Sequence, residues 1–384
     1  MTGTPDDAEP QVLVRREGRV GHLTLNRPLA INALNLPMIE TLQAALTGWV
    51  DDPAVRVVLL DGAGERRFCA GGDIRIVYDS ARAGTDVALR LWRAEYVLDS
   101  TIAAYPKPVV TVLDGITMGG GMGLGCHASH RVATERSLLA MPEVSIGLAP
   151  DVGGHLLLAR APGELGTYLA LTGTRAGPAE ALLCGLVDHV VPVAKIAALT
   201  NRLQHLDPDM AIARSALPAE EIGDAPLRDA RGWIDECFAG TDAEEILARL
   251  RRHRNADAQA CGNRLAEMSP TAVAVSLRGL REARQLDNLP AVLRNDYRCV
   301  NRSLHTPDLT EGIRAAIIDK DFAPVWLPPT LADVTPDMVE QHFAPLGSEE
   351  LDLRAVSATG IDTAGAQAGE SGSTNNGKGQ QPWV

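Results

Sequence analysis

Two glycine-rich turns supply the kind of backbone that acyl-transfer chemistry uses. FCAGGD at residues 68–73 and ITMGGGMGLG at residues 116–125 each follow a predicted strand, and the second runs into a predicted helix. Glycine lets a ligand approach the backbone closely, and the first N–H groups of a helix have no partner within it. One amide from each turn could therefore hold a carbonyl oxygen that becomes negative during the reaction. We predict that the donors are the N–H groups of Ala70 and Gly120.

A simpler alternative is that these glycines only allow tight turns or close packing, which is the commoner role of a single glycine-rich stretch. The occurrence of two such stretches, each just after a strand, weighs against it. The GxGxxG fingerprint of dinucleotide-binding folds does not fit, because its third glycine would fall on Leu124 or Cys126, and the GxxxxGK phosphate loop is absent from the sequence. We therefore expect neither a dinucleotide nor ATP.

A pair of carboxylic acids follows in MPEVSIGLAPDVGG at residues 141–154. Glu143 and Asp151 stand among apolar and small residues, where loss of hydration raises the pKa of a carboxyl toward the range useful for moving protons. Asp151 could equally be the N-cap of the next helix, and the sequence leaves that alternative open. Glu143 has no comparable structural role. We predict that both acids are catalytic.

Other reactive side chains give weaker patterns. Cys126, His127 and His130 match no established set of metal ligands, so we expect structural roles and no metal site. His155 follows the second acid, but a lone histidine is usually structural. The sequence has no GxSxG elbow, which argues against a serine hydrolase.

The elements that would carry these residues alternate between strands and helices. Apolar alternation predicts a hairpin over residues 11–28 and strands at 55–60 and 109–113, while helical periodicity predicts helices at 36–50 and 87–104. This order indicates an α/β fold with a mixed sheet.

The chain also divides by composition. Helical patterns dominate after residue 192, and the last 31 residues are poor in large apolar side chains and rich in Gly, Ser and Thr. We predict four parts: a flexible N-terminus (1–10), a catalytic core (11–206), a helical C-terminal region (207–353) and a disordered tail (354–384).

Bulk properties exclude several classes of protein. The net charge of −13 opposes nucleic-acid binding, and no apolar run is long enough to span a membrane. Six well-separated cysteines indicate reduced thiols rather than a disulfide scaffold. The first residues carry no export or organelle-targeting pattern, so we expect a cytoplasmic protein.

Taken in order, the motifs closely resemble the crotonase superfamily of coenzyme A thioester enzymes, and within it the 3-hydroxyisobutyryl-CoA hydrolases. The resemblance runs from about residue 11 to residue 353 and includes NRPLAINALN near the start, WRAEY at 92–96 and EGIRAAIIDKDFAPVW before the end. It implies a spiral of repeated strand-strand-helix units with a C-terminal helical region. It also implies that the thioester carbonyl lies between the two glycine turns, with Ala70 and Gly120 as the donors.

The resemblance adds further site residues. Glu95 in WRAEY is implied to be a third active-site acid that binds the substrate hydroxyl or orients water, although a solvated helix face is the ordinary explanation for such an acid. Gly71, Gly72, Asp73 and Gly119 are expected to contact the substrate.

The resemblance also separates two reactions. Hydratases of the superfamily commonly have one glutamate at the position of Gly123 and a second at Glu143, whereas the hydrolases have aspartate at Asp151. The residues here favour hydrolysis of a short branched 3-hydroxyacyl-CoA, with 3-hydroxyisobutyryl-CoA and valine catabolism as the leading expectation. An enoyl-CoA hydratase or isomerase and a non-catalytic acyl-CoA-binding subunit stay open as alternatives. His155 departs from the glycine expected there and bears on the acyl pocket.

The expected partners follow from this reading. The ligand is an acyl-CoA, whose coenzyme A is part of the substrate, and we expect no separate cofactor. We expect no nucleic acid and no membrane, and a homo-oligomer is compatible with the assemblies common in the superfamily.

Overall fold

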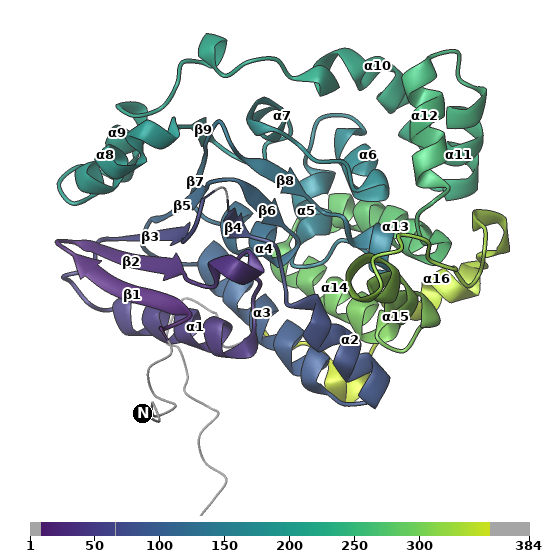
Figure 1. Cartoon of the computed structure of the whole chain (residues 1–384), viewed down its shortest axis with the longest axis horizontal. Coiled ribbons are helices and arrows are strands. Elements are labelled where there is room, and N and C mark those ends of the chain that lie inside the picture. The colour runs from purple at the N-terminus through teal and green to yellow at the C-terminus, as the bar shows by residue number, and fades with distance from the viewer. Residues whose placement is uncertain (1–8, 66, 354–384) are drawn as a thin grey trace, which may run out of the picture.

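A computed structural model describes residues 9–65 and 67–353 of the chain (Figure 1). The described strands are β1 (Val12–Glu17), β2 (Val20–Leu25), β3 (Val57–Gly62), β4 (Arg67–Cys69), β5 (Val109–Leu113), β6 (Ile116–Met118), β7 (His130–Ala133), β8 (Leu138–Ala140) and β9 (His189–Val190). The described α-helices are α1 (Leu36–Trp49), α2 (Ile74–Ala83), α3 (Val87–Ala103), α4 (Gly120–Cys126), α5 (Gly154–Ala159), α6 (Leu165–Thr172), α7 (Pro178–Leu183), α8 (Val193–Leu203), α9 (Pro208–Ala213), α10 (Pro226–Phe238), α11 (Ala243–Arg252), α12 (Ala256–Leu265), α13 (Pro270–Leu286), α14 (Leu289–Ser303), α15 (Pro307–Ile313) and α16 (Pro336–Phe343). None of these helices is long and apolar enough to cross a bilayer.

The strands form two sheets. The larger has the order β1-β2-β3-β5-β7-β9, in which β1 and β2 are an antiparallel hairpin and every later pair is parallel. The smaller sheet, β4-β6-β8, is parallel throughout. Its strands lead directly into the glycine turns and toward the acids, because β4 ends at Cys69 and β6 ends at Met118.

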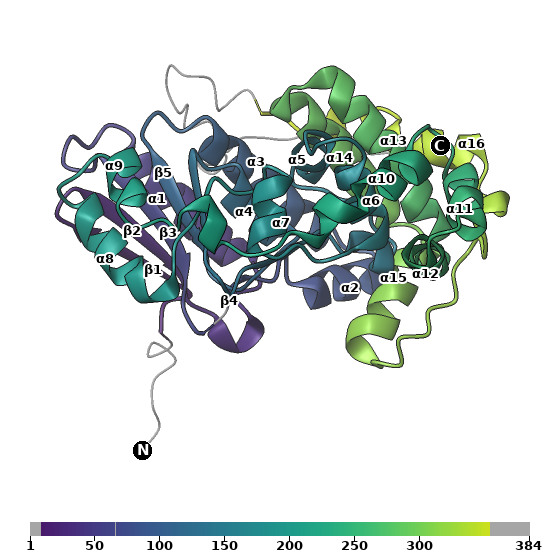
Figure 2. The same cartoon turned by 90° about the horizontal axis from the view of Figure 1, so that it is seen from above.

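The larger sheet is covered on both faces, as its run of apolar residues requires. Along β3, Val58 and Leu60 belong to the main hydrophobic core, whereas Val57 and Leu59 pack in a second cluster with α8 and α9. Successive side chains of a strand point to opposite faces, so this alternation follows from the sequence. Figures 1 and 2 place α8 and α9 at one end of the molecule and α11, α12 and α16 at the other.

The C-terminal helices support the helices that carry the acids. α13 packs against α5 and α6, while α14 packs against α3 and α5. Polar caps fix where the two supporting helices begin: the Ser269 side chain accepts the Ala272 N–H, and the Asn288 side chain accepts the Ala291 N–H. Such caps satisfy helix N–H groups that have no acceptor within the helix.

The predicted hairpin, the strand at 109–113 and the helices at 36–50 and 87–104 are confirmed. The hairpin ends at Leu25, three residues before the predicted end, and the other ends shift by at most one residue. β3 begins two residues after the predicted start at residue 55. α4 begins at Gly120, and this makes Gly120 the first residue of the helix.

The predicted division at residue 206 needs a correction. It separates α8 from α9, although residues of both helices share one cluster on the sheet. The change to the C-terminal helical region therefore lies after α9. The predicted disordered tail (354–384) and most of the predicted flexible N-terminus (1–10) fall outside the described residues.

Candidate functional site

The two glycine turns pack against each other. Gly71 has φ +100°, and a Cβ there would lie 3.0 Å from the Met118 carbonyl oxygen and 3.3 Å from the Gly120 nitrogen. Gly119 also has positive φ, at +49°. Both positions require glycine because an L side chain rarely adopts this backbone. Backbone fills the space at Gly71, and a Glu143 carboxyl oxygen fills it at Gly119. The contact places the Gly72 nitrogen 3.4 Å from the Cβ position of Gly120.

The predicted oxyanion donor Ala70 is wrong. Its N–H already donates to the Ile31 carbonyl oxygen at 2.9 Å, so it fixes the turn instead of binding a ligand. The Gly72 N–H faces the second turn and has no acceptor among the described residues. Gly120 opens α4, so its N–H has no acceptor within the helix. The pair of amides that the geometry offers is Gly72 and Gly120.

Glu95 lies between the two turns. It is 2% exposed, which rules out the solvated helix face. One carboxyl oxygen stands so close to Gly120 that a Cβ there would collide with it, and the other is 3.9 Å from the Cβ position of Gly72. The placement agrees with the predicted role near the substrate. Asp99, one helical turn further along α3, is fully buried, and neither of its carboxyl oxygens has a hydrogen-bond partner.

Glu143 begins a short 3-10 helix, Glu143–Ile146, directly after β8 and the Met141–Pro142 segment. Its side chain is buried, and Oε1 lies 2.8 Å from the Cβ position of Gly119. Oε2 has no hydrogen-bond partner. Glu143 therefore faces the residue that precedes the Gly120 amide.

Asp151 is not a helix cap. The N-cap residue of α5 is Gly153, and that cap receives no side-chain hydrogen bond. The Asp151 carboxylate instead accepts a hydrogen bond from the Tyr96 hydroxyl at 2.7 Å. Tyr96 comes from α3, next to Glu95, so one helix both contributes an acid and holds another.

The buried acids are difficult to ionise. Burial and the neighbouring Asp151 charge raise the pKa of Glu95 to about 8. Burial raises the pKa of Asp151 to about 7, while the Tyr96 hydroxyl limits the rise. Burial and neighbouring acids raise the pKa values of Glu143 and Asp99 well above their usual range. Of the four acids Glu95, Asp99, Glu143 and Asp151, the last is therefore the easiest to ionise.

Two other predicted residues have structural partners. Asp73 lies at the N-terminus of α2, where its carboxylate pairs with Arg27 at 3.2 Å. We therefore do not include its side chain among the substrate contacts. The His127 ring bonds the Val152 carbonyl at 2.8 Å, and burial lowers its pKa to about 4. The structural role expected for His127 is consistent with these contacts.

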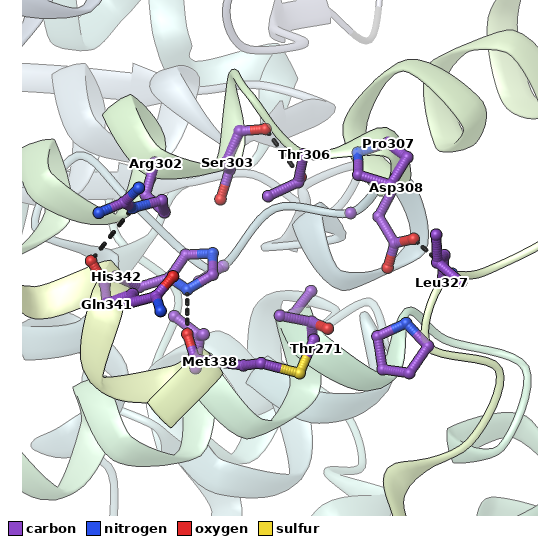
Figure 3. A pocket seen from close by; sticks show the side chains of 15 residues that line it. Thr271, Arg302, Ser303, Thr306, Pro307, Asp308, Leu327, Met338, Gln341 and His342 are labelled. Atoms are coloured by element: carbon purple, nitrogen blue, oxygen red, sulfur yellow. Dashed lines mark hydrogen bonds between the residues drawn. The ribbon is translucent and has the colours of Figure 1, made fainter. Parts of the chain in front are cut away.

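A separate cavity of about 360 Å³ lies beside the segment that joins the two acids (Figure 3). Gly147 and Ala149 form one wall, and the others are formed by residues of α13, α14, α15 and α16 together with Leu327 and Pro328. Glu143 and Asp151 are not among the lining residues. Residues of the two glycine turns are not among them either, so the cavity is separate from the candidate site.

Sequence reasoning missed Tyr96, Asp99 and Asp296. Asp99 follows Glu95 by four residues, so helical spacing alone would have put both acids on one face. Asp296 comes from α14, and no local pattern connects it with residues 151–155. Asp296 reaches Gly153 and His155 only because the fold packs α14 against α5.

Comparison with known proteins identifies the family. A family model described as enoyl-CoA hydratase/isomerase matches residues 20–343. The chain is 39% identical over 354 residues to the Danio rerio protein named 3-hydroxyisobutyryl-CoA hydrolase, mitochondrial, and the match covers 90% of this chain and 92% of that one. The chain belongs to the enoyl-CoA hydratase/isomerase family. The predicted resemblance to the crotonase superfamily and its 3-hydroxyisobutyryl-CoA hydrolases is confirmed, as is the α/β fold.

Solved structures of family members carry other names. The chain is 46% identical to a carnitinyl-CoA dehydratase from Mycobacterium thermoresistibile, with a TM-score of 0.86 and coverage of 90% of this chain and 99% of that one. It is 42% identical to an enoyl-CoA hydratase from Rhodobacter sphaeroides, with a TM-score of 0.83 and coverage of 89% and 100%. The family is thus clear, while its members are named for two kinds of reaction, thioester hydrolysis and hydration or dehydration.

The prediction of a cytoplasmic location is wrong. The curated relatives from Danio rerio, Xenopus laevis, Rattus norvegicus and Homo sapiens are all named as mitochondrial proteins. The prediction rested on the absence of a targeting pattern in the first residues, and an absence in that segment is weak evidence of location.

The position of the first hydratase glutamate, Gly123, is closed in this family member. A Cβ at Gly123 would lie 2.7 Å from the Val152 side chain and 2.8 Å from an Asp99 carboxyl oxygen. A longer side chain at Gly123 would have to displace both neighbours. The site therefore has acids on α3 and at Glu143 and Asp151, but no room for one on this turn of α4.

Proposed function

We propose that the protein hydrolyses short branched 3-hydroxyacyl-CoA thioesters, with 3-hydroxyisobutyryl-CoA as the preferred substrate and valine catabolism as its setting. The observation that carries the proposal is the set of buried acids at the two turns: Glu95 lies between Gly72 and Gly120, Glu143 approaches Gly119, and Tyr96 holds the buried Asp151. The names of the curated relatives support the same reaction. Coenzyme A enters as part of the substrate, and the reaction needs no further cofactor.

The thioester oxygen would lie between the N–H groups of Gly72 and Gly120. Both amides are fixed in place before the substrate binds, so they stabilise the tetrahedral oxyanion without reorganisation. Loss of one such donor costs about 3 kcal/mol in the barrier. Glu95, which stands between the turns, is in position to accept a hydrogen bond from the hydroxyl of a 3-hydroxyacyl group.

Glu143 and Asp151 divide the proton transfers. In the free enzyme Asp151 is a carboxylate and Glu143 is protonated. Transfer of the Glu143 proton to Asp151 then leaves Glu143 as the carboxylate beside the oxyanion turn. Glu143 then removes a proton from water as the water oxygen bonds to the thioester carbon. When the C–S bond breaks, Asp151 gives its proton to the departing thiolate. Both acids return to their starting states, and the products are the hydroxy acid and free coenzyme A.

An alternative is that Glu143 attacks the thioester carbon itself, which gives an anhydride that water then opens. Both routes use the same residues and release the same thiol. Single turnover in ¹⁸O-labelled water distinguishes them, because only the anhydride route can leave the label in Glu143.

A second candidate function is hydration or dehydration, which the names of two solved relatives favour. The closed position at Gly123 weighs against it, because the two-glutamate arrangement cannot form there. A third candidate, a non-catalytic acyl-CoA-binding subunit, would bind thioesters tightly without turnover.

The test is release of free thiol from a panel of acyl-CoAs. We expect the highest kcat/KM with 3-hydroxyisobutyryl-CoA, lower values with straight-chain 3-hydroxyacyl-CoAs, and little thiol from crotonyl-CoA. Tight binding without thiol release would support the non-catalytic subunit, and hydration of crotonyl-CoA without thiol release would support the hydratase.

A further inference from the structure

A buried histidine–aspartate pair joins the turn after Asp151 to α14. His155 Nδ1 and Asp296 Oδ1 are 2.6 Å apart, and the two side chains are 2% and 1% exposed. The other Asp296 oxygen accepts the Gly153 N–H at 2.8 Å. One carboxylate from the C-terminal region therefore holds both the start of α5 and the turn that precedes it.

The turn that the pair holds is strained. Val152 has φ +50° and Gly153 has φ +75°. A β-branched residue rarely adopts the left-handed region, so Val152 needs contacts that over-determine its backbone. The His127 ring bonds the Val152 carbonyl from one side, and Asp296 bonds the Gly153 amide from the other.

The His155 ring has no room to move. A Cβ at Gly279 on α13 would collide with the ring, so the helix passes as close as glycine permits. His155 Nε2 is buried and has no hydrogen-bond partner. The ring is therefore fixed by packing on one side and by Asp296 on the other.

We propose that His155 and Asp296 are positioning residues for Asp151, which hold the left-handed turn behind it and balance two opposite charges beside its carboxyl. The role in thiol release rests on the proposed function, but the contacts do not. This positioning role also explains how the helical C-terminal region acts on the site without supplying a catalytic group, because Asp296 belongs to that region.

Several ionisable groups face Asp151 and determine the charge around it: Glu95, Tyr96 and Asp99 on α3, Glu143 before α5, His155 on α5 and Asp296 on α14. Within this set, Asp296 raises the pKa of Asp151, and His155 lowers it. The two members of the pair thus act on Asp151 in opposite directions.

The experiment removes each charge while keeping its contact. In Asp296→Asn the amide oxygen can accept the Gly153 N–H, and the NH₂ can donate to Nδ1 of a neutral His155 ring. In His155→Asn the side-chain NH₂ stands where Nδ1 was and can donate to Asp296. The readout is the titration midpoint of the Asp151 carboxyl, followed by ¹³C NMR of the full-length free enzyme labelled at aspartate Cγ and assigned with Asp151→Asn.

We expect the midpoint to fall by less than one pH unit in Asp296→Asn, because the neutral His155 ring no longer lowers it, and to rise by about one unit in His155→Asn. The acidic limb of the thiol-release profile should move in the same directions. Asp61→Asn is the matched control, because it alters another His–Asp contact, to His22 at 2.8 Å on the larger sheet. The midpoint in this control should stay at the wild-type value.

Shifts in the same direction, or midpoints equal to that of the control, would overturn the proposal. If only one variant folds, the sign of its shift decides. If neither variant folds, the test is the ¹⁵N chemical shift of the wild-type His155 ring as a function of pH. The shift should change at the titration midpoint of Asp151, and a shift that stays constant there contradicts an electrostatic interaction between the two residues. A wild-type enzyme that releases no thiol would refute the proposed function alone, since the NMR midpoints still test the pair.

Discussion

At the scale of single residues, the site depends on glycines whose missing side chains leave space for acids. The Cβ position of Gly120 is occupied by a Glu95 oxygen, and that of Gly119 approaches Glu143. The sequence predicted that glycines would expose amides, and this reasoning found Gly120. It assigned the wrong partner, because the amide of Ala70 is used by Ile31 and only the three-dimensional pairing of residues 31–34 with 70–73 reveals it.

Glu143→Gln should reduce kcat for thiol release on the order of a thousandfold, because the amide can neither remove a proton from water nor attack the thioester. Binding of a non-hydrolysable thioether analogue should change little, and this control separates lost chemistry from lost folding. Thiol release at near the wild-type rate would remove Glu143 from the mechanism.

Gly120→Ala should reduce kcat/KM on the order of a hundredfold, because the new methyl group collides with Glu95 beside the oxyanion amide. Gly48→Ala is the matched control: it lies in α1, and nothing stands within 4 Å of its Cβ position. Steady-state kinetics of the two variants make the comparison. Equal activity would mean that the space at Gly120 is not part of the site.

The activity should rise with pH up to about 7. The pKa of Asp151 is raised to about 7, so the single charge that the mechanism requires is lost as pH falls below that value. kcat/KM for thiol release should then decrease about tenfold per pH unit on the acidic side. A profile that is flat between pH 5 and pH 7 would contradict the assignment of the charge to Asp151.

At the scale of elements, α3 is the centre of the site. It carries Glu95 and Asp99 on one face and supplies the Tyr96 hydroxyl to Asp151. The helix itself was predictable from its periodicity. Its burial on the acid-bearing face was not, because the glycine turns and α4 cover that face and no short-range pattern reports such a contact.

Tyr96→Phe should raise the pKa of Asp151 by about one unit, because it removes a hydrogen bond to the charged form while keeping the ring. The acidic limb of the thiol-release profile should move to higher pH, with a smaller change in the rate at high pH. Tyr168→Phe is the matched control, since this tyrosine packs on α10 away from Asp151. If the acidic limb of the profile stays in place in Tyr96→Phe, this hydrogen bond does not set the charge of Asp151.

At the scale of the whole molecule, one hydrophobic core runs from Val12 to Leu353 and encloses acids that are not neutralised by cations. This is a cost in stability that a protein carries where function requires it. The order of predicted strands and helices indicated the α/β fold. It could not predict that the C-terminal helices would bury the acid site, because their contacts join residues more than a hundred positions apart.

The stability of the protein should therefore depend on Glu95 and on pH. The pKa of Glu95 is about 8 in the folded chain and 4.5 when unperturbed, so its contribution is fully present below pH 4.5 and is lost as pH rises through 8. Glu95→Gln removes this loss. Relative to wild type, the variant should gain on the order of a few kcal/mol in free energy of unfolding between pH 5 and pH 8, measured with urea. A difference that does not change with pH would show that Glu95 ionises normally.

The most direct test of the central claim is product analysis with 3-hydroxyisobutyryl-CoA and the wild-type enzyme. Free thiol is quantified in parallel with mass spectrometry of the remaining CoA esters. For hydrolysis we expect equal amounts of free coenzyme A and 3-hydroxyisobutyrate, with no dehydrated ester. We expect Glu143→Gln to lose both products. Formation of the dehydrated enoyl-CoA without free thiol would contradict hydrolysis and identify the protein as a dehydratase.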